Sequence, residues 1–392
     1  MKQKNIKKRF RELEDISEAR KFFPMAESCV YLDSAHYAPY SLETERRLRE
    51  YIDRFTHTND NLSIFNNSIM KRIRALAAKV INADESEIII TGSTTHGLNI
   101  FANGIRLSEG DCAAYADSEF PAIVYAWMNQ EKLRGIRNIR IPSANGVIKD
   151  EDVENVLRNN RVRVLTVSSV EFLGFRNDLA ALRELCTRYG TYLVVDAIQS
   201  AGVVPMDVKK INPDFLAAGS QKWMMSPAGI GFSYIPERMK KVIEPTYVST
   251  MSVKYNFENF LDYKLDFNED GSAYENSTPN TLGMIGLESS LELFLKLGTD
   301  NIFRHIKKLL DLFADGLSKR YVIESDLSEK HRSNILIFSC ADKSKNAYVH
   351  KELEKKNIFI ALREGFLRVS PHLFNNRKDI KALLRGLEKI TL

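Results

Sequence analysis

Short apolar runs alternate with amphipathic stretches through the first two thirds of the chain. Several of these runs are apolar at nearly every position, as in YLVVDAI, instead of at every second position. A strand with two apolar faces belongs to a parallel sheet that is covered by helices on both sides. The predicted strands are 87–91, 112–116, 136–141, 162–170, 192–198, 215–218 and 229–235.

Helical patterns separate several of these strands. The clearest are residues 94–105, 151–158 and 179–189, and the last is followed by Gly190, a residue that commonly terminates helices. Strands that alternate with helices predict an α/β fold with a mostly parallel sheet.

The pattern changes near residues 245–280, which are polar, aromatic and poor in aliphatic residues, as expected of an extended loop. Beyond this loop the patterns predict a smaller α+β unit. Its helices are expected at 284–297, 301–320, 347–356 and 378–389, and its strands at 334–340, 358–362 and 367–370.

A chain of 392 residues is too long for one compact core. We expect a large domain over residues 26–280. A smaller domain is expected over 281–392 together with residues 1–25.

Composition excludes several classes of protein. The chain is 44% hydrophobic and 27% charged, which is ordinary for a globular protein. No apolar run approaches the roughly 18 residues that span a bilayer, and the basic N-terminus is followed by acids instead of an apolar signal segment. The 56 Lys and Arg nearly balance the 51 Asp and Glu, so no nucleic-acid surface is indicated. We therefore expect a cytoplasmic enzyme with no membrane partner.

The cysteines indicate neither a metal site nor a disulfide framework. The four are Cys29, Cys112, Cys186 and Cys340, and none has C-x-x-C or Cys/His spacing. So few cysteines in so long a chain do not form a disulfide scaffold.

Chemistry-bearing residues follow several predicted strands, where ligands bind in open α/β sheets. TGSTTH, residues 91–96, opens a helix, so its hydroxyl groups either cap that helix or hold an anion at its N-terminus. Asp196 ends a buried strand and needs a partner, unless it caps the next helix. Lys222 stands among small and apolar residues, so it is either a solvated surface lysine, as most lysines are, or a candidate for a lowered pKa and Schiff-base chemistry.

Aromatic residues follow the strand at 112–116, in SEFPAIVYAW, either as core residues or as a stacking surface. Each of these motifs alone has an ordinary structural explanation. Together, an anion site, an aromatic ring, a buried acid and a lysine match the needs of one cofactor, pyridoxal 5′-phosphate (PLP).

The chain resembles the class V aminotransferase family of fold-type I PLP-dependent enzymes. This family includes cysteine desulfurases, selenocysteine lyases, isopenicillin-N-epimerase-like proteins and serine–pyruvate aminotransferases. The resemblance runs from about Phe22 to the C-terminus. It is carried by KFFPMAESCVYLDSAHYAPY, ITGSTTHGLN, SEFPAIVYAW, VVDAIQSAGVVPMDV, DFLAAGSQKWMMSPAGIGFSY, YENSTPNTLGMIGLESSLE and LREGFLRVSPHLFN. It implies a large domain with a mostly parallel seven-stranded sheet and a smaller α+β C-terminal domain.

The resemblance also implies roles for individual residues. Lys222 would form the internal aldimine and act as the base and acid at the substrate Cα. Asp196 would pair with the pyridinium nitrogen, and Gln199 would donate to the 3′-oxygen of the cofactor. Phe120 matches the ring-stacking position. The family's residues that bind the cofactor phosphate are matched by Thr94, Thr95, Gln221 and Thr278.

In the family the residue matching Thr278 reaches the phosphate of the neighbouring subunit, which implies a homodimer with shared active sites. Ala273 and Ser277 depart from the family pattern around it. Arg368 matches the arginine that holds the substrate carboxylate, and Arg363 is a second candidate. His36 borders the site and either contacts substrate or is structural, whereas His96 reads as helix surface.

Two departures bear on the reaction. Gly219 replaces a serine that desulfurases use at the phosphate. Desulfurases also attack sulfur with a cysteine shortly before the segment that matches 366–370, and this chain has no Cys between Leu353 and Ser370. The resemblance therefore disfavours persulfide chemistry.

Three functions remain open from the sequence. The first is a class V aminotransferase-like enzyme that acts on a small amino acid through Lys222. The second keeps the cofactor but is an epimerase or a lyase of the cysteine or selenocysteine type, and Phe120 leans this way because it matches the epimerase-like branch. The third is a non-catalytic relative, which the complete set of cofactor residues disfavours.

Overall fold

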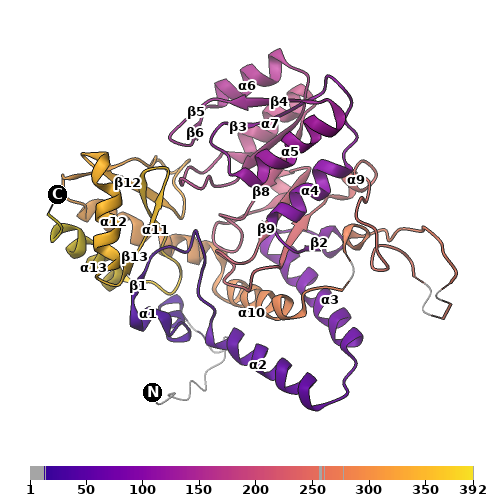
Figure 1. Cartoon of the computed structure of the whole chain (residues 1–392), viewed down its shortest axis with the longest axis horizontal. Coiled ribbons are helices and arrows are strands. Elements are labelled where there is room, and N and C mark those ends of the chain that lie inside the picture. Colours follow the sequence, from indigo (N-terminus) through magenta and orange to yellow (C-terminus); the bar gives the residue numbers. More distant parts are fainter. Residues whose placement is uncertain (1–12, 14, 256–257, 260, 277, 392) are drawn as a thin grey trace.

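The computed structural model of the chain describes residues 13, 15–255, 258, 259, 261–276 and 278–391 (Figure 1). Its centre is a seven-stranded sheet with the order β2-β10-β9-β8-β7-β3-β4. β10 runs antiparallel to both of its neighbours, and the other pairs are parallel. The strands are β2 (Ile88–Thr91), β3 (Cys112–Ala116), β4 (Arg137–Ile141), β7 (Val162–Ser168), β8 (Tyr192–Asp196), β9 (Phe215–Gly219) and β10 (Gly231–Tyr234).

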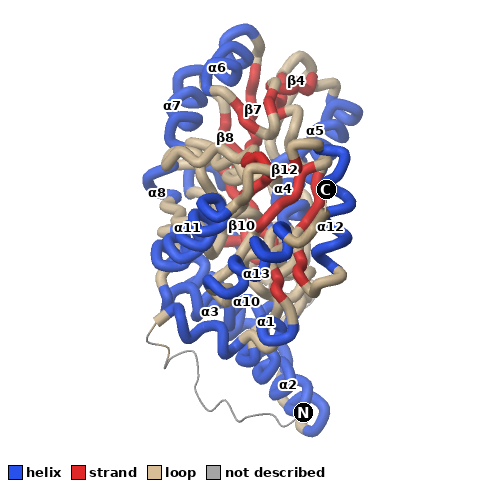
Figure 2. Tube along the Cα trace, turned by 90° about the vertical axis from the view of Figure 1, so that its left-hand side faces the viewer, coloured by secondary structure: helices blue, strands red, loops and turns tan. Residues whose placement is uncertain are grey.

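Helices cover both faces of this sheet (Figure 2). Successive residues of a strand point to opposite faces, so Ala113 and Tyr115 of β3 join one core while Cys112 and Ala114 join the other. The first core lies beneath α4 (Thr94–Gly104) and α5 (Pro121–Arg134). The second lies beneath helices that include α6 (Asp150–Asn159), α7 (Leu179–Tyr189) and α10 (Thr281–Leu297).

Gly97 allows α4 to approach the sheet closely enough for the N-terminus of this helix to reach the strand ends. A Cβ at Gly97 would lie 2.2 Å from Ser233 Oγ and 2.7 Å from Ala217 Cβ. We expect Gly97→Ala to destabilise the fold by about 1–3 kcal/mol, because the added carbon overpacks this contact. Thermal unfolding would measure the change. Gly92→Ala is the matched control, since the nearest atom to its Cβ would be 3.7 Å away, and an equal loss in both variants would contradict this explanation.

A four-stranded antiparallel sheet with the order β11-β12-β15-β14 forms a second unit in the C-terminal third of the chain. Figure 1 shows this unit beside the N-terminal residues that include β1. Parallel pairing of Val30 with Ile358 joins those residues to it. The elements are β1 (Val30–Tyr31), β11 (Tyr321–Ile323), β12 (Leu336–Cys340), β13 (Ile358–Phe359), β14 (Ala361–Arg363), β15 (Phe366–Val369), α11 (Thr299–Gly316), α12 (Asn346–Glu354) and α13 (Arg377–Glu388).

The remaining elements frame these two sheets. α2 and α3 both pack against α10, and a two-stranded ribbon of β5 and β6 follows β4. The loop that follows residue 245 projects away from the body of the molecule (Figure 1). The bounds are α1 (Met25–Ser28), α2 (Leu42–His57), α3 (Leu62–Ile81), β5 (Ser143–Ala144), β6 (Val147–Ile148), α8 (Val208–Ile211) and α9 (Glu237–Lys240).

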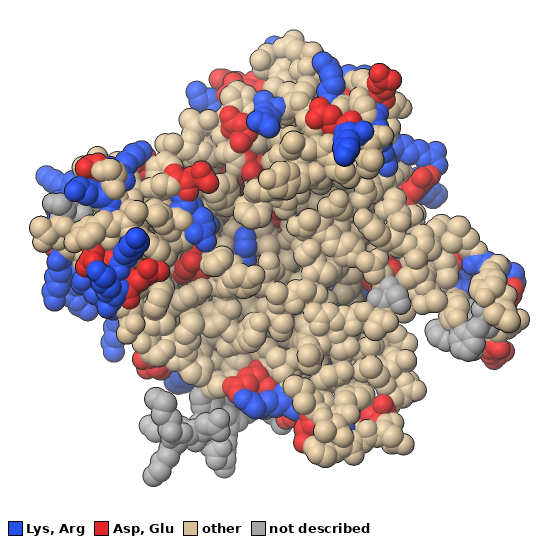
Figure 3. All heavy atoms as spheres, viewed as in Figure 1, with Lys and Arg blue, Asp and Glu red and all other residues tan. Residues whose placement is uncertain are grey.

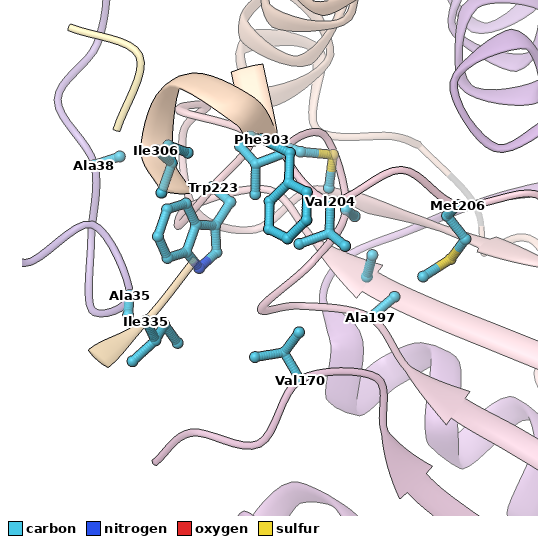
Figure 4. Close-up of a cluster of buried hydrophobic side chains, with 14 of the residues drawn as sticks. Ala35, Ala38, Val170, Ala197, Val204, Met206, Trp223, Phe303, Ile306 and Ile335 are labelled. Atoms are coloured by element: carbon cyan, nitrogen blue, oxygen red, sulfur yellow. The ribbon is translucent and has the colours of Figure 1, made fainter. Parts of the chain in front are cut away.

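A buried cluster around Trp223 joins segments that are far apart in the sequence (Figure 4). Ala35 and Ala38 come from the N-terminal segment, and Phe303 and Ile306 come from α11. The Trp223 side chain is 0% exposed. Because Trp223 directly follows Lys222, this packing fixes the backbone from which the lysine projects.

The predicted fold class is confirmed. The elements that were predicted differ from the structure mainly at their ends, whereas the helices α2, α3 and α5 were not predicted. α11 stops at Gly316 instead of residue 320, because Gly316 packs against Leu384 and Leu317 is extended. The predicted strand 358–362 is two strands, since Ile358–Phe359 pairs with β1 and Ala361–Arg363 pairs with β15. The division into domains at residue 280 stays a prediction.

Charged side chains of both signs are interspersed on the face of the molecule shown in Figure 3. Within the described part of the chain, no helix combines the length and the apolar character needed to cross a bilayer. The same residues contain no cluster of three or more His, Cys, Asp or Glu side chains suited to a metal ion.

Candidate active site

The predicted cofactor residues come from the carboxyl-terminal ends of several strands of the large sheet. Thr94 follows β2, Phe120 follows β3, Asp196 ends β8 and Lys222 follows β9. Parallel strands bring their carboxyl ends to one edge, so residues that are far apart in the sequence converge there.

Lys222 lies in the turn between β9 and β10, with its amine facing the Phe120 ring. Nζ is 5.4 Å from the centroid of that ring. The pKa of Lys222 is lowered to about 8, chiefly by burial and in addition by the positive charges of Arg368 and Arg363, while the negative charge of Asp196 opposes the shift. A substantial fraction of this amine is therefore neutral and nucleophilic near neutral pH.

Asp196 is a buried acid at the end of a central strand. It is 2% exposed, and its Oδ1 accepts a hydrogen bond from the Ile198 backbone N–H at 2.9 Å. Burial raises the pKa of Asp196 to about 6, against the opposing effect of the Ile198 hydrogen bond and the Lys222 charge. A cationic partner would offset the free-energy cost of burying the ionised carboxylate, and a protonated pyridine nitrogen is such a partner.

Phe120 is the residue that precedes α5, whose first position is Pro121, a residue well suited to a helix start. The extended backbone of Phe120 and the fixed φ of the proline set the direction of the ring. The Phe120 side chain is 46% exposed although Lys222 lies against it, so one surface of this large apolar ring remains open.

The start of α4 supplies hydroxyl groups beside β9. Ser93 caps the helix by accepting from the His96 backbone N–H at 3.1 Å, and Thr94 Oγ1 accepts from the Gly219 N–H at 2.7 Å. Thr95 is exposed at the same helix end. The free N–H groups of this first turn favour an anion.

Gly219 keeps the space between α4 and the lysine turn open. A Cβ at this position would lie 2.8 Å from Gln221 Oε1 and 3.1 Å from Thr94 Oγ1. The glycine therefore leaves room for both the Gln221 amide and the Thr94 hydroxyl, and a larger residue at this position would press against them.

Gln199 is held by partners on both sides of its amide. Its Oε1 accepts from Trp223 Nε1 at 2.7 Å, and its Nε2 donates to the Ala35 carbonyl at 3.2 Å. The second hydrogen on Nε2 is the one that remains for a cofactor oxygen.

Two arginines lie on one face of the hairpin formed by β14 and β15. Arg368 pairs across the strands with Ala361, and Arg363 is two residues from Ala361, so both guanidinium groups share a face. Arg368 is 2% exposed and donates to Asp33 Oδ1 at 3.2 Å and to the Phe172 carbonyl at 3.0 Å, while its buried Nε has no partner among the described residues.

His36 lies near the same arginines. Its Nδ1 is 3.6 Å from Asp33 Oδ2, and its side chain is 54% exposed. Partial burial lowers the pKa of His36, and the charges of Arg363, Arg368 and Lys222 add to this effect, while Asp33 opposes it. His36, the two arginines and Lys222 are thus close enough for their charges to act on one another.

Thr278 lies apart from these groups, in a cavity of about 230 Å³ that it shares with Gly92, His96 and Gly229. The backbone of Thr278 has φ 34°, a region that non-glycine residues rarely adopt. His96 is not on an open helix surface: its Nδ1 accepts from the Gly92 N–H at 3.1 Å, and burial lowers the pKa of its imidazole.

Sequence reasoning missed three buried acids beside the site. Asp33 holds Arg368, and Glu119 and Glu171 follow β3 and β7. Glu119 directly precedes Phe120, and Glu171 directly precedes Phe172. An acid followed by an aromatic residue, just after an apolar strand, is the feature of the sequence that could have indicated these two.

These residues fit PLP, which needs an acid for its pyridine nitrogen, an aromatic ring for its face, hydroxyl and N–H donors for its phosphate and an amine for its aldehyde. The donor set contains each of these groups at one edge of the sheet. The fold and the site together define a PLP-dependent enzyme.

The comparison with known families agrees. A family model described as Aminotransferase class-V matches residues 30–385. A probable cysteine desulfurase of Borreliella burgdorferi is 26% identical over 96% of this chain and 97% of its own length. An uncharacterized aminotransferase of Bacillus subtilis, YcbU, is 25% identical over 92% of this chain and 94% of its own length.

Solved structures show the same fold. A cysteine desulfurase from Thermococcus onnurineus NA1 has a TM-score of 0.86 at 23% identity and covers 96% of this chain and 98% of its own. A cystine C–S lyase in complex with cysteine persulfide has a TM-score of 0.85 at 20% identity, with coverage of 94% and 99%. The chain belongs to the class V aminotransferase family, and its cofactor is pyridoxal phosphate.

Proposed function

We propose that the protein is an aminotransferase-like PLP enzyme that acts at the Cα of a small amino acid through Lys222. The main supporting observation is the Lys222 amine, which has a lowered pKa, faces the Phe120 ring and is subject to the negative charge of Asp196. When bound, PLP supplies an electron sink for the bond that breaks at Cα.

Lys222 has two tasks in this proposal. Its neutral amine would bind the cofactor aldehyde. After substrate has replaced it, the same amine would take the proton from Cα as a base and, for transamination, deliver it as an acid to the carbon that carried the aldehyde. Asp196 keeps the pyridine nitrogen protonated by its negative charge. Thr94, Thr95 and Gln221 would hold the phosphate, and Gln199 would donate to the 3′-oxygen.

The guanidinium groups of Arg363 and Arg368 orient the substrate by its carboxylate, since a planar guanidinium binds a carboxylate with two hydrogen bonds. Arg368 is already bonded to Asp33 and to the Phe172 carbonyl. Arg363 donates to the Leu362 carbonyl and forms no ion pair among the described residues. Both therefore belong to the proposed substrate site, with His36 at its exposed border.

The pH dependence of cofactor capture tests the assignment of Lys222. Because only the neutral amine reacts, we expect the rate at which apoprotein captures PLP to rise with pH and to level off above about 8. Arg363→Gln should move this midpoint to higher pH, because it removes a positive charge that lowers the pKa of Lys222. The change in visible absorbance after mixing gives the rate.

The control for this prediction is Arg161→Gln, which removes an exposed cation that pairs with Asp111. It should leave the midpoint unchanged. A midpoint near 10.5, the ordinary pKa of a lysine, would contradict the assignment of Lys222 as a group with a lowered pKa.

Persulfide chemistry is disfavoured by the hairpin between the two arginines. Arg363 pairs directly with Phe366, so the turn holds only Glu364 and Gly365, both with positive φ. Such a turn has no room for a mobile loop. The nearest cysteine in the sequence, Cys340, is 1% exposed on β12, and burial raises the pKa of its thiol.

The second candidate is a lyase or epimerase on the same scaffold. The structural likeness to a cystine C–S lyase favours the lyase, because breaking a bond at Cβ needs the same lysine and cofactor and no cysteine loop. Phe120 at the ring position favours the epimerase-like branch.

One experiment separates these reactions. Purified protein with PLP is incubated with small amino acids, with and without a 2-oxo acid as amino acceptor. Transamination gives one keto acid and one new amino acid in equal amounts, and only when the acceptor is present. Lyase action without an acceptor gives ammonia, pyruvate and sulfide from cysteine, or ammonia, pyruvate and cysteine persulfide from cystine, and epimerisation gives only the other enantiomer. No keto acid with any donor would overturn the first proposal.

We also propose a homodimer in which Thr278 completes the site of the neighbouring subunit, by analogy with the family. Mixing inactive Lys222→Ala and Thr278→Ala subunits tests this. Partial recovery of activity on mixing is expected if the two residues serve one site from different subunits, and no recovery would overturn it.

A further inference from the structure

Glu119 and Glu171, here called the carboxyl pair, are two buried acids beside the site. They are 6% and 1% exposed. Their side chains are within hydrogen-bonding reach of each other. Among the described residues neither forms an ion pair with an arginine, lysine or histidine, so the pair must be stabilised in another way.

The hydrogen bonds give the two acids different roles. Glu119 Oε1 accepts from the Ser168 N–H at 2.7 Å and Oε2 accepts from Ser168 Oγ at 2.6 Å, as a carboxylate does. Glu171 Oε1 accepts from Asn177 Nδ2 at 2.9 Å, whereas its buried Oε2 faces no donor in the described part of the chain. A proton on Glu171 Oε2 satisfies this atom, because it can be donated to Glu119.

The electrostatic effects of nearby groups agree with a proton on Glu171 and an ionised Glu119. Burial raises the pKa of both acids, and the negative charge of Glu119 raises the pKa of Glu171 further. Asp196 is the third acid that acts on the pair, and it also raises both pKa values. Three carboxyl groups in one buried region are not all ionised at neutral pH.

The carboxyl pair connects the two loops that carry site residues. The next residue in each loop is a phenylalanine, and the rings of Phe120 and Phe172 meet edge to face with centroids 6.1 Å apart. Phe120 faces Lys222, and the Phe172 carbonyl accepts from Arg368. A displacement of either loop would therefore move both the ring and the arginine anchor.

We propose that Glu119 and Glu171 share one proton and are positioning residues, which fix the Phe120 ring against the cofactor and the Phe172 carbonyl against Arg368. This rests on the stacking role proposed above for Phe120. It does not depend on which reaction the enzyme performs.

The same chemical change at the two positions should have unequal effects. In Glu171→Gln the amide oxygen accepts from Asn177 and the amide N–H replaces the shared proton, so the PLP dissociation constant of the apoprotein should stay within about 2-fold of wild type. In Glu119→Gln an N–H meets the donors of Ser168, and in Glu171→Leu the hydrogen bond is lost. Both should weaken PLP binding about 10-fold, the effect of one buried hydrogen bond.

Titration of apoprotein with PLP and the visible circular dichroism of the bound cofactor are the readouts. Glu119→Gln and Glu171→Leu should alter the circular dichroism in the same way as Phe120→Leu, because all three disturb the ring. The matched control is Glu43→Gln, a buried glutamate bonded to Arg46 and Arg47 on α2, which should change stability but neither readout.

Tolerance of Glu119→Gln together with loss in Glu171→Gln would overturn the placement of the proton. Unchanged binding in Glu171→Leu while Phe120→Leu weakens it would overturn the positioning role, and an unchanged Phe120→Leu would overturn the stacking role on which the proposal rests. If Glu119→Gln does not fold, Glu171→Gln against Glu171→Leu decides alone, since only the former keeps the hydrogen bond.

Discussion

Replacing Lys222 with alanine is expected to abolish the covalent attachment of PLP and to lower turnover by about 10³-fold or more. The two losses have one cause, since the same amine binds the aldehyde and moves the Cα proton, and a general base alone contributes about 10²–10⁴-fold. Borohydride reduction followed by mass spectrometry measures the attachment. Steady-state kinetics with the donor found in the amino-acid screen measures the turnover.

Two comparisons make this prediction specific. Lys209→Ala removes an exposed lysine that pairs with Asp84, and it should change neither attachment nor turnover. Lys222→Arg keeps the positive charge but cannot form the imine, so it should resemble Lys222→Ala. Covalent PLP in the reduced Lys222→Ala protein would show that another amine holds the cofactor.

Asp196→Asn is expected to lower turnover by about 10²–10³-fold with a smaller loss of PLP affinity, because it removes a preorganised charge and keeps the shape of the side chain. The asparagine still accepts from the Ile198 N–H, so the strand end is preserved. What is lost is the negative charge that holds a proton on the pyridine nitrogen. The visible absorbance of the bound cofactor, followed against pH, should therefore change along with the rate.

Asp214→Asn is the control for this prediction. Asp214 is also a buried acid beside a central strand, but it is bonded to Arg183 and Arg238. Its replacement should lower the unfolding temperature without altering the cofactor spectrum. Equal spectral changes in the two variants would mean that Asp196 acts only through the stability of the sheet.

Asp196 also contributes to stability in a definite pH range. Its pKa is raised in the folded state, so the fold binds this proton more tightly than the unfolded chain. Without cofactor, the contribution is present below the ordinary pKa of an aspartate and is lost as pH rises towards about 6. A bound pyridinium would reverse this penalty, and the gain in unfolding temperature on PLP binding should therefore be smaller in Asp196→Asn.

Local patterns predicted the large sheet well because its strands, except the edge strand β4, are buried on both faces. The boundaries of β3 and α7 agree with the predicted ranges 112–116 and 179–189, since each is closed by a strong local signal such as Gly190. The seven-residue run at 192–198 was too long by two residues, because Asp196 turns to bond the Ile198 N–H and ends the strand.

What local patterns could not predict depends on contacts between distant segments. Asp33 and Arg368 meet across 335 residues, and nothing near either one indicates the other. The carboxyl pair was missed for a similar reason, because a glutamate in a loop ordinarily reads as a solvated residue. Burial of Glu119 follows only from tertiary packing, which places its carboxylate against Ser168 at the end of β7. The reaction depends on side chains that only the folded protein brings together. The order of motifs in the sequence therefore predicts the family but not the reaction.

The tight hairpin between Arg363 and Arg368 limits how this scaffold could be changed. A two-residue turn with positive φ at both positions leaves no site from which a single added thiol could travel to a substrate sulfur. If the enzyme acts as proposed, sulfur transfer through a cysteine on this hairpin would require inserted residues and not the exchange of one. Redesign of the chain for that reaction would accordingly begin with a change in backbone length between β14 and β15.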